Sequence, residues 1–482
     1  MEEPLNEKLN TERERRFGAR RIILIALSAA IIIAAFCVFY FYGMAHRGAY
    51  LRRDFLLPAV SIAAFAAIAV LMLPRLIDTL AGREQLYCGL PYEYISDAPK
   101  NVRKSFLKII IAALVLHTVT GLIGALLFSA CYKLPLTDGR FFEIWRSAWM
   151  KSNTDAGHYL NIAENWYVKD GVDKLLIVFF PMLPSLVNIL NHLTHDSFVS
   201  AQIINNIATC LTAGMTYLTL IPLLGDRRAK CAAFITLLLP GAIFMNSPMT
   251  EPLFMLFSVC CFYFIQKRRF ILAGIFCALA GYTRSLGVLL AVPLFISGIG
   301  HIVGLIRSKK KWWPAALRLF IGLVISSFGT LAYLYINYSI HGDCFKFFEY
   351  QATNWYQQAI PFYDTPVYML RYLLRDLDTA PDTVVSLWLC GFAAIYGSLA
   401  LMIHRARRLP AAYTVYFLCY FAVAVGCSWL LSATRYLCAA LPVTVGVSIG
   451  CDKKWKTIAI FVLLAVLYIL YMLMYMLRWD VY

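Results

Sequence analysis

Four ionisable residues stand where apolar segments of the sequence break: Asp155, Glu251, Arg284 and Arg435. A charge at the centre of a bilayer costs roughly 2.5–3.5 kcal/mol on insertion scales, so ionisable residues in membrane segments usually have a purpose. Displacement at the anomeric carbon of a sugar needs a base for the acceptor's proton, and a carboxylate supplies it. A phosphate leaving group needs positive charge, which guanidinium groups supply without losing their proton. One acid, Asp155, with the two arginines, Arg284 and Arg435, fits the transfer of a sugar from a lipid phosphate.

Ordinary structural roles compete with this chemical interpretation. Asp155 stands directly before a mostly apolar run, as the N-cap of a helix does. Glu251 would also serve in a structural salt bridge with an arginine. A phosphate leaves as an anion and does not require the second, protonated carboxylate that glycosidases use. The sequence leaves the structural and the chemical roles open.

The composition places these residues in a membrane protein. Of the 482 residues, 61% are apolar and only 15% are charged, against about 45–50% and 25% in soluble domains. This balance excludes a soluble globule, a disordered chain, a collagenous fibre and a secreted disulfide scaffold. The net charge of +17 would suggest nucleic acid in a soluble protein, but the positive-inside bias of membrane proteins accounts for it here. The 14 cysteines contain no Cys-x-x-Cys pair, so a structural zinc site is not expected.

Apolar runs of spanning length predict an all-α, polytopic integral membrane protein. One span needs about 20 residues, and we expect about 13 transmembrane helices. Residues 1–21 form a basic tail, and no small-residue cleavage site follows the first run, which favours an anchor over a signal peptide. The expected spans cover residues 22–43, 55–76, 105–131, 199–224, 231–246, 252–265, 270–282, 287–306, 314–338, 383–403, 411–431, 436–450 and 457–477.

Basic clusters orient these spans. With a cytoplasmic N-terminus, alternation puts the main clusters on the cytoplasmic side. They are Arg103/Lys104, Arg227/Arg228/Lys230, Lys267/Arg268/Arg269, Lys309/Lys310/Lys311, Arg405/Arg407/Arg408 and Lys453/Lys454/Lys456, with Arg47, Arg52 and Arg53 as the exception. Counting residues 175–190 as a span would invert every later cluster. Because Pro181 and Pro184 interrupt regular helix, we expect a re-entrant or interfacial helix there.

Two long outer loops, residues 132–174 and 340–381, are rich in Trp, Tyr and carboxylates, and we expect the site between them. The aromatic segment 345–363 would stack on sugar, line a lipid entrance or simply mark the membrane interface. His192 and His195, with Asp196, have a spacing compatible with metal binding, but the sequence offers no assignable third ligand.

Short motifs around the four ionisable residues follow one another in a recognisable order. They are Asp155-Ala156-Gly157-His158-Tyr159-Leu160, Phe179-Phe180-Pro181-Met182-Leu183-Pro184, Ser247-x-x-x-Glu251, Thr283-Arg284-Ser285-x-Gly287, His341-Gly342-Asp343 and Ser432-x-x-Arg435-Tyr436. Each motif alone has low specificity. In this order and approximate spacing, from about residue 105 to 450, they resemble the GPI mannosyltransferase 2 (PIG-V) family and its prokaryotic relatives.

The resemblance implies a GT-C glycosyltransferase fold and a polyprenyl-phosphate sugar donor, with mannose the sugar in eukaryotic members. It implies that Asp155 is the general base of an inverting transfer and that Arg284 and Arg435 bind the carrier phosphate. The resemblance also implies that His158, Tyr159, Glu251 and Tyr436 contact the substrate, or, for Glu251, orient a partner residue. The acceptor would be a hydroxyl of a lipid, glycan or protein on the non-cytoplasmic face. The resemblance leaves a divalent metal open, and no nucleic-acid partner is expected.

Two features depart from that family. An aromatic residue, typically Trp, usually precedes the acid, whereas this chain has Thr154, which affects the expected sugar contact. Residues 1–104 form a basic tail, an additional hairpin and a loop before the transferase domain expected over residues 105–482. The hairpin favours a bacterial relative in the plasma membrane over the enzyme of the endoplasmic reticulum.

Two other functions remain as alternatives. A transporter or flippase tends to place ionisable residues and broken helices near the midplane, in matched positions of two repeats. In this sequence the charges gather at one expected face and no repeat is visible. A non-catalytic assembly partner would tolerate changes at Asp155.

Overall fold

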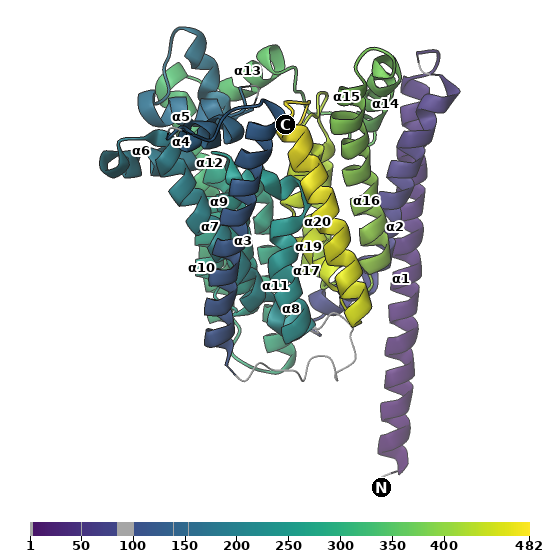
Figure 1. The fold of residues 1–482 in the computed structure, drawn as a ribbon. Coiled ribbons are helices and arrows are strands. Elements are labelled where there is room, and N and C mark those ends of the chain that lie inside the picture. Colours follow the sequence, from purple (N-terminus) through teal and green to yellow (C-terminus); the bar gives the residue numbers. More distant parts are fainter. Residues whose placement is uncertain (1–2, 50, 84–100, 138, 153) are drawn as a thin grey trace.

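Helices make up most of the described residues in the computed structural model (Figure 1), which describes all residues except 1–2, 50, 84–100, 138 and 153. For residues 3–19 it describes the backbone only. The described residues include no strand, only one isolated bridge between Ala359 and Cys427. The predicted class, an all-α polytopic membrane protein, is confirmed.

Among the described residues, eight helical segments are long and apolar enough to cross a membrane. Several join a short 3-10 or π segment (η) to an α-helix. They are α1 (Glu3–Ala45), η1 (Arg52–Phe55) with α2 (Leu56–Leu80), α3 (Val102–Cys131), α7 (Ser197–Leu224), η5 (Ser285–Leu290) with α11 (Ala291–Arg307), α12 (Trp313–His341), α15 (Pro381–Thr383) with η6 (Val384–Leu389) and α16 (Cys390–Arg405), and α20 (Lys454–Met476).

Within the described residues the expected count of 13 spans is not confirmed, because several apolar runs make short or broken helices. Three helices have only 16, 14 and 15 residues: α9 (Glu251–Gln266), α10 (Phe270–Thr283) and α17 (Ala411–Val425). Residues 436–450 do not form one span, since they are divided between α18 (Ala433–Cys438) and α19 (Leu441–Ser448). With two bent pairs counted as one span each, the described part of the chain has up to ten.

Both bent pairs carry or adjoin motifs from the sequence. The first joins η3 (Val172–Val178) to α6 (Met182–Thr194) at 115°. Residues 175–190 therefore do not form a straight span, in agreement with the expectation, and Pro181 is the N-cap of α6. The second joins α8 (Asp226–Leu238) to η4 (Pro240–Asn246) at 70°, and Pro240 begins η4.

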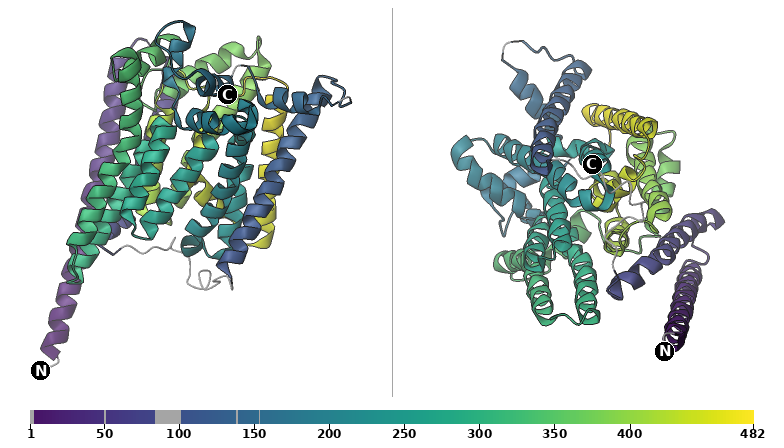
Figure 2. Two further views of the ribbon diagram at one scale, coloured as in Figure 1. Left: turned by 90° about the vertical axis from the view of Figure 1, so that its left-hand side faces the viewer. Right: turned by 90° about the horizontal axis from the view of Figure 1, so that it is seen from below.

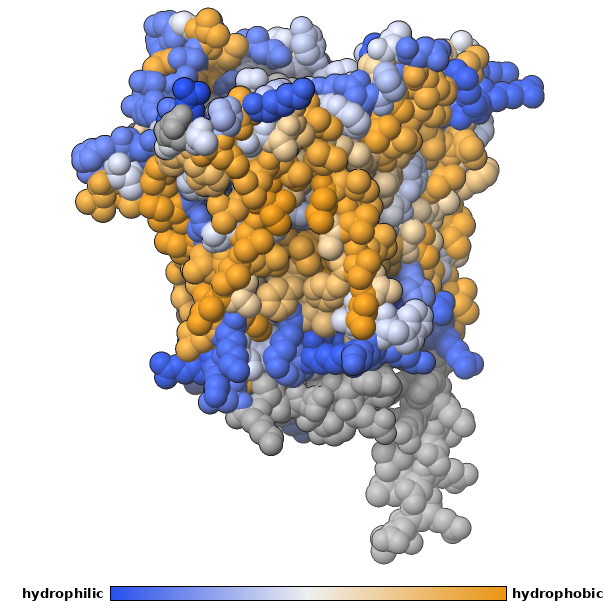
Figure 3. Space-filling model, viewed as in Figure 1, coloured by the Kyte–Doolittle hydropathy of each residue, from blue (hydrophilic) through white to orange (hydrophobic). Residues whose placement is uncertain are grey.

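On the face of the bundle shown in Figure 3, an apolar belt lies between two polar ends. The helix α1 lies at the rim, and none of its 18-residue spanning window is buried (Figure 2). At one end lie the short helices α4 (Phe141–Trp149), α5 (Ala156–Asn165), α6, α13 (Lys346–Asn354) and α14 (Thr365–Asp376) (Figure 1). Basic clusters gather at the other end, where Arg227 Nη2 lies 3.3 Å from Thr457 Oγ1.

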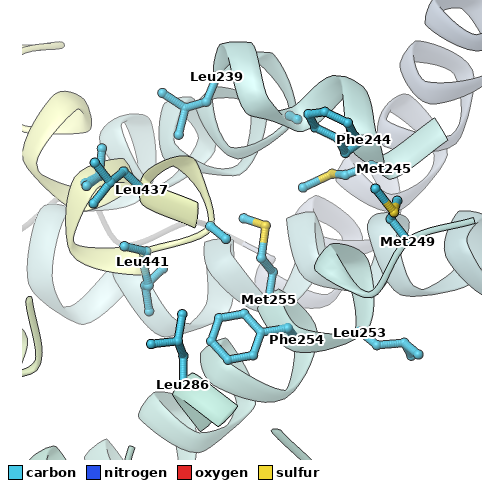
Figure 4. Packing of buried hydrophobic residues seen from close by; sticks show 14 of the residues in the cluster. Leu239, Phe244, Met245, Met249, Leu253, Phe254, Met255, Leu286, Leu437 and Leu441 are labelled. Atoms are coloured by element: carbon cyan, nitrogen blue, oxygen red, sulfur yellow. The ribbon is translucent and has the colours of Figure 1, made fainter. Parts of the chain in front are cut away.

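Local sequence fixes where two of the central helices begin. Asn101 Oδ1 accepts a hydrogen bond from Lys104 N at the start of α3, and Asp196 Oδ1 accepts one from Val199 N at the start of α7. Buried residues of η4, α9, η5, α18 and α19, and of the turn between η4 and α9, pack together (Figure 4). They include Phe244, Met249, Phe254, Leu286, Leu437 and Leu441.

Candidate active site

The four ionisable residues singled out in the sequence converge at one end of the bundle. Asp155 precedes α5, Glu251 is the first residue of α9, Arg284 follows α10 and Arg435 lies in α18. Arg435 Nη2 lies 2.8 Å from Asp155 Oδ2, and Arg435 Nε lies 3.3 Å from Glu251 Oε1. Arg284 pairs with the same oxygen of Glu251. We call these four residues the ion-pair network.

Asp155 does not act as a helix cap, although it occupies the N-cap position of α5. Its side chain makes no capping hydrogen bond, and its carboxylate turns to Arg435 instead. The contacts of Asp155 are therefore those of an ion pair and not those of a helix cap.

Glu251 does take part in a buried salt bridge, as the structural alternative for this residue proposed. Its side chain is 3% exposed, and its second oxygen, Oε2, is buried without a hydrogen-bond partner among the described residues. A charge buried in this way is tolerated only when it is paired. Glu251 thus pairs with both arginines from the buried side of the network.

Exposure separates the members of the network. The side chain of Asp155 is 30% exposed, whereas those of Arg284 and Arg435 are 13% and 5% exposed. Asp155 is therefore the carboxylate that a molecule arriving from the polar end of the bundle can reach. Arg284 is the more accessible of the two guanidinium groups.

Arg435 is held in place from several sides. Its Nη2 donates to Ser432 Oγ at 3.0 Å, and its Cζ lies 5.4 Å from the centre of the Phe244 ring. A Cβ at Gly241 would lie 2.8 Å from the carbonyl oxygen of Thr434, so glycine lets η4 approach α18 closely. The roles of Phe244 and Gly241 were not predicted, because no local motif marks a residue that acts through packing across the bundle.

Arg284 is held between Glu251 and Tyr436. Its Cζ lies 4.8 Å from the centre of the Tyr436 ring, within cation–π range. The Tyr420 hydroxyl donates to the Tyr436 backbone carbonyl at 2.8 Å and fixes that turn. Tyr436 thereby lies beside both arginines, since Arg435 Cζ is 5.3 Å from the same ring.

His158 and Tyr159 take opposite places on α5. His158, one turn after Asp155, is half-buried and stacks on Phe179 at 5.0 Å between ring centres. Tyr159 is buried beneath the network and hydrogen-bonded to Thr250. Burial, together with the nearby Asp155 carboxylate, raises the pKa of Tyr159, which keeps its hydroxyl protonated.

Two of the four expected substrate contacts, Tyr159 and Glu251, lie deeper than the other two. Tyr159 and Glu251 are both buried under the ion pairs, so neither reaches a molecule above Asp155 without rearrangement. The sequence could not distinguish them, because the side of α5 or α9 that turns inward depends on how the helices pack. His158 and Tyr436 remain partly accessible.

The aromatic segment 345–363 contributes one residue to this neighbourhood. Trp355 meets Phe179 edge-on at 5.7 Å, on the ring that His158 stacks against. By contrast Phe345, Phe348 and Tyr356 are exposed, as expected for aromatic residues at a membrane interface.

His192, in α6, and His195, directly after it, do not lie in a cluster with a third metal ligand among the described residues. Within the described ranges, no group of three or more His, Cys, Asp or Glu side chains could hold a metal ion. Asp196, the nearest acid in sequence, caps α7 and pairs with Arg146.

A buried lysine supports the turn that carries Asp155. Lys151 Nζ donates to the carbonyl oxygens of Trp479, at 2.5 Å, and Val481, at 3.0 Å. Its own carbonyl accepts a hydrogen bond from Thr154 Oγ1 at 2.8 Å. Residues 479–481 therefore hold the α4–α5 turn, a contact between distant segments that no sequence pattern indicated.

Comparisons with known proteins give limited resemblance. The apo oligosaccharyltransferase of Archaeoglobus fulgidus is 13% identical, with 76% of this chain and 56% of that chain covered and a TM-score of 0.38. The archaeal oligosaccharyltransferase AglB from the same organism, in complex with an inhibitory peptide and a dolichol-phosphate, is also 13% identical. The comparison covers 76% of this chain and 56% of that chain, with a TM-score of 0.37. This chain thus spans little more than half the length of those proteins. No family model and no curated protein matches the sequence. The function has to be inferred from the site itself.

Proposed function

We propose that this protein is a membrane glycosyltransferase of the GT-C type that moves a sugar from a polyprenyl-phosphate carrier to a hydroxyl acceptor. The observation that carries the proposal is the ion pair between Asp155 and Arg435 beside Arg284. It joins one accessible carboxylate to guanidinium groups at a polar end of an apolar bundle. The ordered motifs that resemble the PIG-V family support mannose as the sugar.

The proposed reaction is a single displacement. The acceptor oxygen forms a bond to the anomeric carbon while the bond from that carbon to the phosphate oxygen breaks. The electron pair of the broken bond goes to the carrier phosphate, and the acceptor's proton goes to Asp155. One displacement inverts the configuration at the anomeric carbon.

The residues of the network take different parts in this reaction. Asp155 is the base, because it is the accessible carboxylate of the network. Arg284 binds the carrier phosphate, because its guanidinium is the more accessible one and guanidinium groups bind phosphate oxygens bidentately. Arg435 orients Asp155 and adds positive charge beneath the phosphate. Glu251 and Tyr159 position the arginines from below.

The accessible neighbours suit the acceptor and the sugar. His158 lies one turn from Asp155 on α5, and Tyr436 lies beside both arginines. Trp355, which is half-buried and meets the buried Phe179 edge-on, adds a flat apolar face near His158. Such faces pack against the C–H face of a sugar ring, which would take the place of the aromatic residue missing at Thr154.

The orientation proposed for the site is non-cytoplasmic, with a cytoplasmic N-terminus. The basic clusters lie at the end of the bundle away from the network, and basic loops usually face the cytoplasm. The carrier would then enter from the outer leaflet of the membrane.

A transfer assay tests the proposal. Protein in lipid is incubated with radiolabelled polyprenyl-phosphate mannose and cell-envelope extract, and labelled product is separated from donor. We expect transfer by the wild type and a loss of at least about 100-fold in Asp155→Asn. Asp170→Asn is the matched control, because Asp170 is an exposed acid of the same outer segment and its variant should keep full activity.

The outcomes separate the proposal from its alternatives. Wild-type turnover in Asp155→Asn would refute the general-base role. No transfer by the wild type from mannose, glucose, galactose or arabinose donors would favour the transporter or the assembly partner. Label that moves into a product only with the wild type and Asp170→Asn would identify a lipid-donor glycosyltransferase and supply its acceptor.

A further inference from the structure

A hollow lined by arginines lies at the basic end of the bundle, remote from the ion-pair network. It has a volume of about 440 Å³ and is formed by the end of α2, by Arg20 of α1 and by the turn before α17. Its polar lining consists of four guanidinium groups and the carboxylate of Asp78, together with Thr79. The arginines are Arg20, Arg75, Arg83 and Arg407.

Groups of the protein itself pair with only some of these four arginines. Asp78 pairs with Arg20 at 2.7 Å, and Arg75 Nε donates to the Arg407 carbonyl oxygen at 3.2 Å. Among the described residues, the side chains of Arg83 and Arg407 make no hydrogen bond or ion pair, and Arg20 Nε is buried without a partner. Like charges brought together around one hollow repel each other, so an anion that enters it would stabilise the arrangement.

We propose that this hollow binds the phosphate headgroup of an anionic phospholipid, such as phosphatidylglycerol, in the leaflet on the basic side of the membrane. Guanidinium groups match phosphate oxygens in pairs, and basic pockets between membrane helices on the cytoplasmic side bind anionic headgroups. The proposal does not depend on the transferase reaction.

The rest of the lining favours a lipid over a soluble anion. Leu71, Pro74, Pro410 and Ala411 line the hollow beside the arginines, and α2 and α17 continue from it into the apolar belt. A headgroup among the arginines would thus have apolar surface next to it for its glycerol and acyl chains. The lipid would also join the N-terminal hairpin to the rest of the bundle. Arg20, Arg75 and Arg83 come from α1, α2 and the residues directly after α2, whereas Arg407 comes from the turn before α17.

Native mass spectrometry of the full chain in detergent tests the proposal. Phosphatidylglycerol and phosphatidylcholine are titrated separately, and inorganic phosphate is a third arm. The test variant is Arg83→Ala/Arg407→Ala, which removes two charges without removing a side-chain hydrogen bond or ion pair within the described residues. The control is Arg103→Ala/Lys104→Ala, which removes the same charge from exposed side chains at the start of α3.

We expect one phosphatidylglycerol to be retained by the wild type and the control, and its affinity to fall about tenfold or more in the test variant. The melting temperature without added lipid should be the same in all three proteins, which shows that each is folded. Three results would overturn the proposal: equal retention by the test variant, an equal loss in the control, or equal retention of phosphatidylcholine. Displacement of the lipid by inorganic phosphate at similar concentration would assign the hollow to a soluble anion instead.

Discussion

The carboxylate of Asp155 lies 2.8 Å from Nη2 of Arg435, and the same guanidinium lies 3.3 Å from Glu251 through Nε. One planar group thus holds an accessible and a buried acid in fixed relation. A lysine would keep the charge but has a single ammonium group, which does not reproduce the paired donors.

Arg435→Lys should therefore lower the rate of transfer by about tenfold or more, because Asp155 would lose its orientation. The KM for the donor should change less, since Arg284 keeps the more accessible contact to phosphate. Steady-state kinetics with varied donor measure both. Arg146→Lys is the control, because Arg146 pairs with Asp196 outside the network. A change in donor KM alone would make Arg435 a phosphate ligand and not a positioning residue.

Glu251→Gln should destabilise the protein by about 3 kcal/mol, because it leaves two buried guanidinium groups with one acid. A lower melting temperature in detergent would report this loss. In the double variant Glu251→Gln/Arg284→Met one buried charge is removed from each side, so its loss should be smaller than the sum of the two single losses. Additive losses would show that the Arg284–Glu251 contact contributes little.

Gly241→Ala should disturb the site through packing. Its Cβ would meet the Thr434 carbonyl oxygen at 2.8 Å and Cys438 Cβ at 2.9 Å, and overpacking of this kind costs about 1–3 kcal/mol. Because α18 carries Arg435, we expect reduced transfer as well as a lower melting temperature. Gly397→Ala is the control, since nothing lies within 4 Å of the added carbon. Full activity in Gly241→Ala would mean that α18 shifts without moving Arg435.

Lys151 predicts a dependence of stability on pH. Burial lowers its pKa to about 8 from an ordinary value of 10.5, with Asp480 opposing and Arg478 adding to the shift. Between these values the unfolded chain binds more protons than the folded one, so the free energy of unfolding should rise with pH from about 8 to 10.5. In Lys151→Met this contribution should be absent. Parallel pH profiles of melting temperature for the two proteins would contradict the shift.

The sequence singled out four ionisable residues that the structure brings together, but it did not show how the apolar runs divide into helices. Asp155, Glu251, Arg284 and Arg435 were found because charge beside an apolar run is conspicuous. The expected count of 13 spans is not confirmed, because hydropathy does not reveal that residues 436–450 break into two short helices at Ala439 and Ala440. Contacts such as Lys151 with Trp479 join segments far apart in the chain, and only the folded structure brings them together.

The accessible carboxylate of Asp155, paired with Arg435 inside the network, has a consequence for turnover. If transfer proceeds as proposed, the carrier phosphate gains one negative charge as it leaves, since a phosphate monoester is mostly doubly charged at neutral pH. At the same moment Asp155 gains a proton. The total charge of network plus carrier is therefore the same before and after the sugar moves. No counter-ion has to enter or leave a site where Glu251 and Arg435 are nearly inaccessible, so the chemical step should be insensitive to ionic strength even where donor binding is not.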